Sequence, residues 1–143
     1  MKLELQANQE ILTRIHENNV QTIETAQAAA GEDSESERES RPFIPGVQVR
    51  DTAWQALLDT GVSSYIDYEL LLSLSETYSM QAIYKETGMH LVNASMTMAA
   101  TATVHRAEID NEVMQGHFMG YFTMLLTMEE TLLNSYRESM KLL

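Results

Sequence analysis

Three long stretches with apolar residues at helical spacing constrain the fold of this chain more than any other feature. The first, from Leu3 to Ala30, contains neither glycine nor proline. Its larger apolar residues recur mostly three, four or seven positions apart, which places them on one side of an α-helix. Such a helix would be about 42 Å long, so a partner of similar length has to pack beside it. These residues are Leu5, Ile11, Leu12, Ile15, Val20, Ile23 and Ala26.

The other two stretches predict a central and a last helix. From Asp67 onward, apolar residues fit helical spacing over more than one face, so this helix should be central with two packed sides. Gly88 could kink or break it, because glycine disfavours a helix interior by about 1 kcal/mol relative to alanine. A turn is expected between Thr101 and Asp110. The last helix, from about Asp110 to Leu142, contains no proline and repeats its apolar residues every three or four positions.

A short helix is predicted between the first and the central helix. Asp51 or Thr52 can cap its start, and Gly61 fits a left-handed stop just beyond its end. The segment from Ser64 to Asp67 resembles a capping box, with aspartate in place of the usual glutamate. It should introduce the central helix.

Aromatic and amide side chains bear on how these helices pack. We expect Trp54 and Tyr68 to anchor the short helix on the central one. Asn8, Asn18 and Asn19 lie on or near the apolar stripe of the first helix. A polar residue facing the core can set helix register, but the edge of the stripe is the commoner place for asparagine and the one we predict.

The sequence therefore predicts an all-α fold: a single domain over residues 1–143, an up-and-down bundle of three long helices plus one short helix. Residues 31–45 form an acidic linker between the first helix and the rest, because this segment is rich in acids and serines. Two apolar pairs around Pro45-Gly46 should lie across the helix ends. Gly116 and Gly120 would let another backbone approach closely if they face inward.

Charge and composition exclude several classes of protein. The chain has 9 basic and 21 acidic residues, so its formal charge is −12, and it has no cysteine. We therefore expect no nucleic-acid partner and no binding to anionic membranes, since both depend on basic surfaces. Disulfides, thiolate nucleophiles and cysteine-ligated zinc are excluded. No apolar run is long enough to span a bilayer, and the start lacks a signal-peptide pattern.

The histidines form no strong metal motif. Glu86 and His90 are four residues apart, and His105 and Glu108 are three apart, so each pair could supply two ligands from one helix face. A zinc site needs three or four protein ligands, and no HExxH motif is present. A metal site using His90, His105 or His117 is the third hypothesis for function. The four histidines are His16, His90, His105 and His117.

Methionine is abundant in the second half of the chain. We interpret these residues mainly as core packing, with a soft partner-binding surface or a Cu(I) site as alternatives. If the central and last helices are antiparallel neighbours, Met96 and Met98 come near Met114 and Met119. The methionines in these two helices include Met80, Met89, Met96, Met98, Met114, Met119, Met124 and Met128.

No pattern predicts an enzyme. There is no GxSxG or SxxK arrangement for a nucleophile and no glycine-rich phosphate loop. Glu129 and Glu130 are adjacent, so on a helix they diverge by about 100° and should form part of a solvated face. We therefore assign no catalytic, cofactor-binding or metal-binding residue and expect no cofactor.

Three stretches carry a resemblance to a known group of proteins. They are residues 5–22, residues 51–69 with Thr52-Ala53-Trp54 and Thr60-Gly61, and residues 129–136. They resemble the soluble helical region of uncharacterised bacterial single-pass membrane proteins, in which a transmembrane helix usually precedes the first long helix. The resemblance implies an extracytoplasmic bundle tethered at its N-terminus. This chain begins at Met1-Lys2 without such a segment, so the alternative of a soluble cytoplasmic relative stays open.

The sequence favours a non-enzymatic helical module that acts by protein–protein contact, as a protein-interaction or structural domain of a membrane-associated bacterial protein. Self-association through an exposed stripe is part of this hypothesis. The alternative is a ligand-sensing bundle that holds a small apolar or cationic molecule among aromatic rings. The rings in question are Tyr78, Tyr84, Phe118 and Tyr121.

Overall fold

The computed structural model describes residues 1–30, 49–104 and 111–143, with side chains over 1–25, 49–97 and 120–143. This part of the chain is helical and contains no strand, which confirms the predicted all-α class. It comprises α1 (Lys2–Ala30), α2 (Thr52–Asp59), the 3-10 helix η1 (Val62–Tyr65), α3 (Tyr68–Val104) and α4 (Asn111–Leu142). The acidic linker predicted over residues 31–45 lies outside the described residues, as do residues 105–110 of the segment in which a turn was expected, whereas residues 101–104 belong to α3.

α3 is one uninterrupted helix of 37 residues. It continues through Gly88, where the sequence indicated a kink or a break, and Gly88 is buried. Gly120 of α4 is exposed, and a Cβ there would meet nothing within 4 Å, so it is not a point of close backbone approach. The environment of Gly116 lies outside the described side chains.

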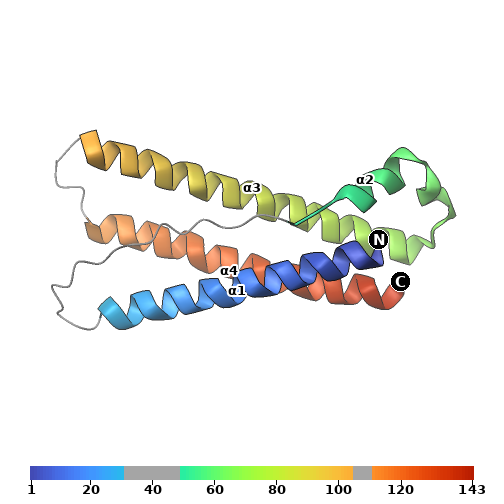
Figure 1. Ribbon diagram of the computed structural model, residues 1–143, viewed down its shortest axis with the longest axis horizontal. Coiled ribbons are helices and arrows are strands. Elements are labelled where there is room, and N and C mark those ends of the chain that lie inside the picture. The colour runs from blue at the N-terminus through green and yellow to red at the C-terminus, as the bar shows by residue number, and fades with distance from the viewer. Residues whose placement is uncertain (31–48, 105–110) are drawn as a thin grey trace.

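Side-chain contacts fix the directions of the three long helices. Glu4 of α1 bonds Tyr78 of α3, and Asn8, one turn later in α1, bonds Gln81, which also comes later in α3. The two helices α1 and α3 therefore run parallel. Ser73 near the start of α3 bonds Ser139 near the end of α4, and Tyr84 farther along α3 bonds Glu129, which comes earlier in α4. The two helices α3 and α4 therefore run antiparallel. Both chain termini lie at the end of the molecule that carries α2 and η1 (Figure 1).

The three long helices therefore do not alternate up and down among themselves. The chain does reverse its direction before α3, as the prediction with a short helix and a crossover requires, because Asp51 lies beside Lys85 and Trp54 beside Tyr78, nearer the start of α3. The physical reason is the length of the connections. About 20 residues separate α1 from α2, and an extended chain gains about 3.3 Å per residue, which is enough to return along the whole of α1. The few residues between α3 and α4 permit only an antiparallel neighbour.

The hydrophobic core lies where α4 packs against both α1 and α3. Leu74 and Leu125 are fully buried as the spacing requires, and Ile15 is half-buried. Each fully buried side chain of this size contributes about 1.5–3 kcal/mol. The core cluster contains Leu5, Leu12, Leu74, Tyr78, Tyr84, Leu91, Leu125, Leu132, Leu133 and Tyr136.

The ends of the short helix α2 are fixed in two ways. Gly61 has φ +68°, so the predicted left-handed stop after α2 is confirmed. Asp51 occupies the position before the first turn, but its side chain makes no capping hydrogen bond. Glu4 of α1 takes over that role, because its Oε2 accepts a hydrogen bond from the Ala53 N–H at 2.9 Å.

The capping box predicted before α3 is wrong. Asp67 is itself the capping residue, since its Oδ1 accepts hydrogen bonds from the Glu69 N–H at 2.9 Å and the Leu70 N–H at 3.4 Å. Ser64 instead donates its hydroxyl to the Gly61 carbonyl oxygen at 3.0 Å. An aspartate side chain is short enough to cap the turn that immediately follows it.

The two predicted aromatic anchors behave differently. Trp54 of α2 stacks on Tyr78 of α3, with ring centroids 5.2 Å apart and planes within 6°, so its anchoring role is confirmed. Tyr68 is 76% exposed and anchors nothing, so that prediction is wrong.

Candidate functional site

The centre of the bundle holds a cluster of polar side chains around Glu129 of α4, here called the Glu129 cluster. Glu129 is 0% exposed. Its Oε1 accepts hydrogen bonds from the Asn19 amide at 2.6 Å and the Tyr84 hydroxyl at 3.0 Å, and its Oε2 lies 3.0 Å from Nδ1 of His16. One carboxylate therefore joins α1, α3 and α4. The fifth member, Glu130, is exposed and has its Oε1 3.9 Å from Nε2 of His16.

Burial controls the electrostatics of this cluster. Loss of water raises the pKa of Glu129 above its ordinary value, while the hydrogen bonds from His16, Tyr84 and Asn19 partly oppose that rise. Burial, and then the neighbouring carboxylate, raises the pKa of Tyr84 far above the usual range, so this phenol stays neutral. The carboxylate has all its contacts inside the protein, and Nε2 of His16 is the part of the cluster that faces the edge of the bundle.

The structure corrects three predictions here. Glu129 does not share a solvated face with Glu130, and Asn8 and Asn19 are buried in the core, whereas Asn18 is exposed. The burial of Glu129 could have been predicted from helical spacing. Glu129 lies between the buried Leu125 and Leu132, four residues after one and three before the other.

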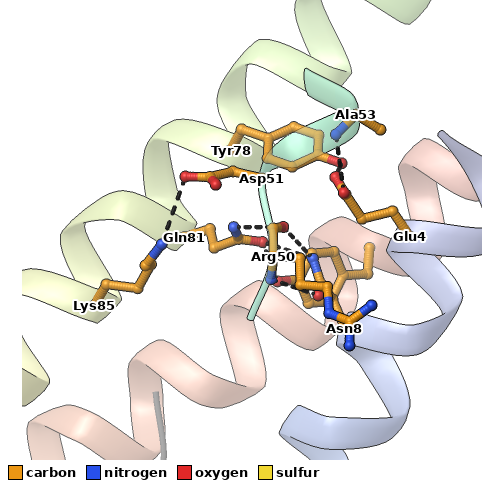
Figure 2. Close-up of polar contacts among 9 residues, drawn as sticks. Glu4, Asn8, Arg50, Asp51, Ala53, Tyr78, Gln81 and Lys85 are labelled. Carbon is orange, nitrogen blue, oxygen red and sulfur yellow. Dashed lines mark hydrogen bonds and ion pairs between the residues drawn. The ribbon is translucent and has the colours of Figure 1, made fainter. Parts of the chain in front are cut away.

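A second group of buried polar residues, here called the clamp, consists of Asn8 of α1 and Gln81 of α3. Between them passes a non-helical segment, residues 49–51, here called the strap (Figure 2). The Asn8 side chain accepts a hydrogen bond from the Arg50 N–H at 2.8 Å and donates one to the Arg50 carbonyl oxygen at 2.6 Å. Gln81 donates to the same carbonyl oxygen at 3.0 Å. The clamp thus holds the main chain of one residue from both sides.

Further bonds complete the clamp. Asn8 donates to Oε1 of Gln81 at 3.1 Å, and the Tyr136 hydroxyl of α4 donates to the same atom at 2.6 Å. Across the described side chains, no buried nitrogen or oxygen lacks a hydrogen-bond partner. Burial raises the pKa of Tyr136 well above its usual range, which keeps this donor in place. The clamp is therefore a saturated network that orders three helices around the strap.

Contacts on either side of Arg50 extend the interaction. Val49 is 4% exposed, and Oδ2 of Asp51 lies 3.5 Å from Nζ of Lys85. Glu4 accepts hydrogen bonds from the Ala53 N–H and from the Tyr78 hydroxyl, the latter at 2.8 Å (Figure 2). The strap fills the space between α1 and α3, whose backbones make little direct contact in the described residues.

Of the histidines proposed as metal ligands, His90 is the one whose side chain the structure describes. His90 and Glu86 are both exposed, with Nε2 3.7 Å from Oε1. His105 and Glu108, and the side chain of His117, lie outside the described part. Among the residues that can be judged, no group of three or more histidine, aspartate or glutamate side chains could hold a metal ion.

Of the four aromatic residues proposed to hold a ligand, the three with described side chains lie in different surroundings. Tyr78 and Tyr84 are buried and donate their hydroxyls to Glu4 and Glu129 respectively, whereas Tyr121 is exposed. The Phe118 side chain lies outside the described part.

The methionines divide between core and surface. Met80 and Met128 pack against the core as predicted, but Met89, Met96 and Met124 are exposed. The side chains of Met98, Met114 and Met119 are not among those described.

The segments at the end of the bundle where both termini, α2 and η1 lie (Figure 1) contain many exposed apolar residues. Among the residues whose side chains are described, eight of the thirteen exposed large apolar ones belong to this end, and Tyr65 is the most exposed of them at 90%. We call them the apolar end. They are Leu3, Leu58, Val62, Tyr65, Tyr68, Leu72, Leu142 and Leu143.

Comparison of the chain with family models, with curated proteins and with solved structures gives no match. In the described ranges, no helix is both long enough and apolar enough to cross a membrane.

Proposed function

We propose that the protein is a non-enzymatic helical module that acts by protein–protein contact, of the membrane-associated type that the sequence resemblance implies. The apolar end carries this proposal. Single exposed apolar residues are ordinary on a soluble protein, but a group of them at one place is typical of an interaction surface. Here the group draws on five elements of the chain, α1, α2, η1, α3 and α4.

The partner that we propose is a second copy of the chain, docked through the apolar end. Tyr65 and Tyr68 are suited to the centre of such an interface, because tyrosine combines a large apolar area with little conformational freedom to lose. The net charge of −12 on each copy opposes the association. Salt screens that repulsion, so higher ionic strength should favour the dimer.

The buried polar clusters support a structural role for the bundle centre and not a catalytic one. The Glu129 carboxylate is already bonded to three side chains, and the clamp is saturated by the strap. Neither has a free polar atom directed at a cavity in the described region.

Sedimentation velocity across a concentration series, at low and at high salt, tests the proposal. The wild-type chain should show a dimer whose fraction rises with concentration and with salt. A Tyr65→Ser, Tyr68→Ser double variant should remain monomeric, with unchanged helix content because both side chains are exposed.

The matched control is a Met89→Ser, Met96→Ser variant, which removes two exposed apolar side chains of α3 that lie away from the apolar end. It should associate like the wild type. A wild-type chain that is monomeric at every concentration and salt would refute the self-association, and equal association of both variants would refute the apolar end as its site.

A further inference from the structure

We propose that the groove between α1 and α3 is a binding site for an extended peptide of a partner protein, which the strap of this chain occupies in cis. The site reads the main chain through the clamp of Asn8 and Gln81. The partner peptide that replaces the strap has three consecutive residues of defined type. The first is a branched apolar residue, the second can be any residue except proline, and the third is aspartate or glutamate. This inference does not depend on the apolar end.

The geometry of the clamp is that of a main-chain receptor. The Asn8 carboxamide pairs with both the N–H and the carbonyl oxygen of Arg50, and Gln81 binds the same carbonyl oxygen. The Arg50 residue itself is exposed. The clamp therefore recognises the peptide group of this residue and does not read its side chain.

The neighbouring positions of the strap supply selectivity. Val49 is buried, so a branched apolar side chain fits there. Asp51 faces Lys85, and a carboxylate is favoured at that place. Trp54 stacks on Tyr78 three residues later, so an aromatic residue at that distance adds to the binding.

The clamp cannot be left empty without cost. If the strap leaves, the buried Oδ1 of Asn8 and one donor each of Asn8 and Gln81 lose their partners. Another extended peptide can restore all three bonds, because every residue other than proline carries one main-chain N–H and one C=O group. Exchange of one extended segment for another is therefore the natural way for this groove to change occupant.

The covalently attached strap has the advantage of a high effective concentration, so a partner binds well only when the strap is weakened. Arg50→Pro provides that change. It removes the main-chain N–H that donates a hydrogen bond to Oδ1 of Asn8, and it leaves every side chain of α1 and α3 unchanged. Arg50→Ala is the matched control, since it keeps the N–H.

The experiment measures the binding of dye-labelled, N-acetylated synthetic peptides of residues 48–58 to the full-length chain by fluorescence anisotropy. The wild-type and Arg50→Ala peptides should bind the Arg50→Pro chain equally. The Arg50→Pro peptide should bind at least about tenfold more weakly, which corresponds to one lost bond of about 1.4 kcal/mol. The Arg50→Ala chain should bind all three peptides more weakly than the Arg50→Pro chain does.

A second measurement uses the wild-type chain, in case the Arg50→Pro chain does not fold. Trp54 is the sole tryptophan. Displacement of the strap by excess peptide with Trp54→Phe should change the Trp54 emission of the chain, and the Arg50→Pro form of that peptide should not. The proposal would be overturned if the Trp54→Phe peptide and its Arg50→Pro form had equal effects. It would also be overturned if neither the anisotropy nor the Trp54 emission showed saturable binding. A mixed dimer of the Arg50→Pro and Arg50→Ala chains in sedimentation, with Tyr65→Ser and Tyr68→Ser in both to remove the apolar-end contact, would overturn the choice of occupant in favour of a second copy.

Discussion

Replacement of Glu129 separates two contributions of the bundle centre, its hydrogen bonds and its charge. Glu129→Ala leaves the buried amide of Asn19 and the buried hydroxyl of Tyr84 without an acceptor. Each such loss costs about 1–3 kcal/mol. His16 is partly exposed and can turn to water. We expect Glu129→Ala to lower the free energy of unfolding by about 3–5 kcal/mol, a large part of the 5–15 kcal/mol typical of a domain.

Glu129→Gln should have a different effect at neutral pH. A glutamine carbonyl oxygen can accept both bonds that Oε1 of Glu129 now accepts, and its amide can donate to Nδ1 of His16. Because the pKa of Glu129 is raised in the folded protein, the ionised carboxylate is disfavoured there relative to the unfolded chain. The glutamine variant should therefore be as stable as the wild type at pH 7, or more stable.

The sign of the pH dependence follows from the same shift. A carboxyl group whose folded pKa lies above its unfolded pKa stabilises the protein fully below the unfolded value, and this contribution is lost as the pH rises through the folded pKa. The free energy of unfolding of Glu129→Gln minus that of the wild type should thus increase from about pH 4.5 upward. Urea denaturation followed by circular dichroism at several pH values measures this difference. A flat difference, or a loss below about 1 kcal/mol for Glu129→Ala, would refute the reasoning.

Three further changes test the packing, each by urea denaturation. Trp54→Ala should lower the free energy of unfolding by about 2–3 kcal/mol, less than the loss for a fully buried tryptophan. Tyr68→Ala should change it by no more than about 0.5 kcal/mol, because Tyr68 is exposed. Similar losses for the two variants would contradict the anchor assignment. Gly61→Ala should cost about 1–2 kcal/mol through its positive φ alone, because the added Cβ meets open space, and a neutral result would be inconsistent with that φ. Tyr136→Phe should cost about 1 kcal/mol by removing one donor to Gln81, and no loss would argue against that bond.

Much of the fold was predictable because apolar spacing reports it directly. The spacing placed both ends of α1 and α4 and the start of α3 to within about a residue, and Gly61 marked the end of the short helix through its left-handed backbone. Parallel packing of α1 and α3 was not predictable in the same way. Helix direction depends on how a long connection runs, and apolar spacing contains no information about that.

The candidate sites were much harder to predict. The sequence presents Glu129 as one of two adjacent acids, and its burial depends on donors from residues 16, 19 and 84. The role of Arg50 in the clamp depends on its main chain and so leaves no mark on the residue type. Asn8 was detectable as an amide on the apolar stripe, but the general preference of asparagine for the edge of such stripes led to the wrong placement.

The polar contacts of α1 also determine the order in which the molecule can assemble. Ser73 and Ser139, which join α3 to α4, are 66 residues apart, whereas His16 and Glu129 are 113 apart. Closing the shorter loop costs less chain entropy, so the α3–α4 hairpin should form before α1 docks on α4, whereas the contacts of α1 with the strap close loops that are shorter still. During synthesis, Asn8 can therefore bond Arg50 before α4 has been made, whereas the Asn19 amide stays bonded to water until Glu129 has been made.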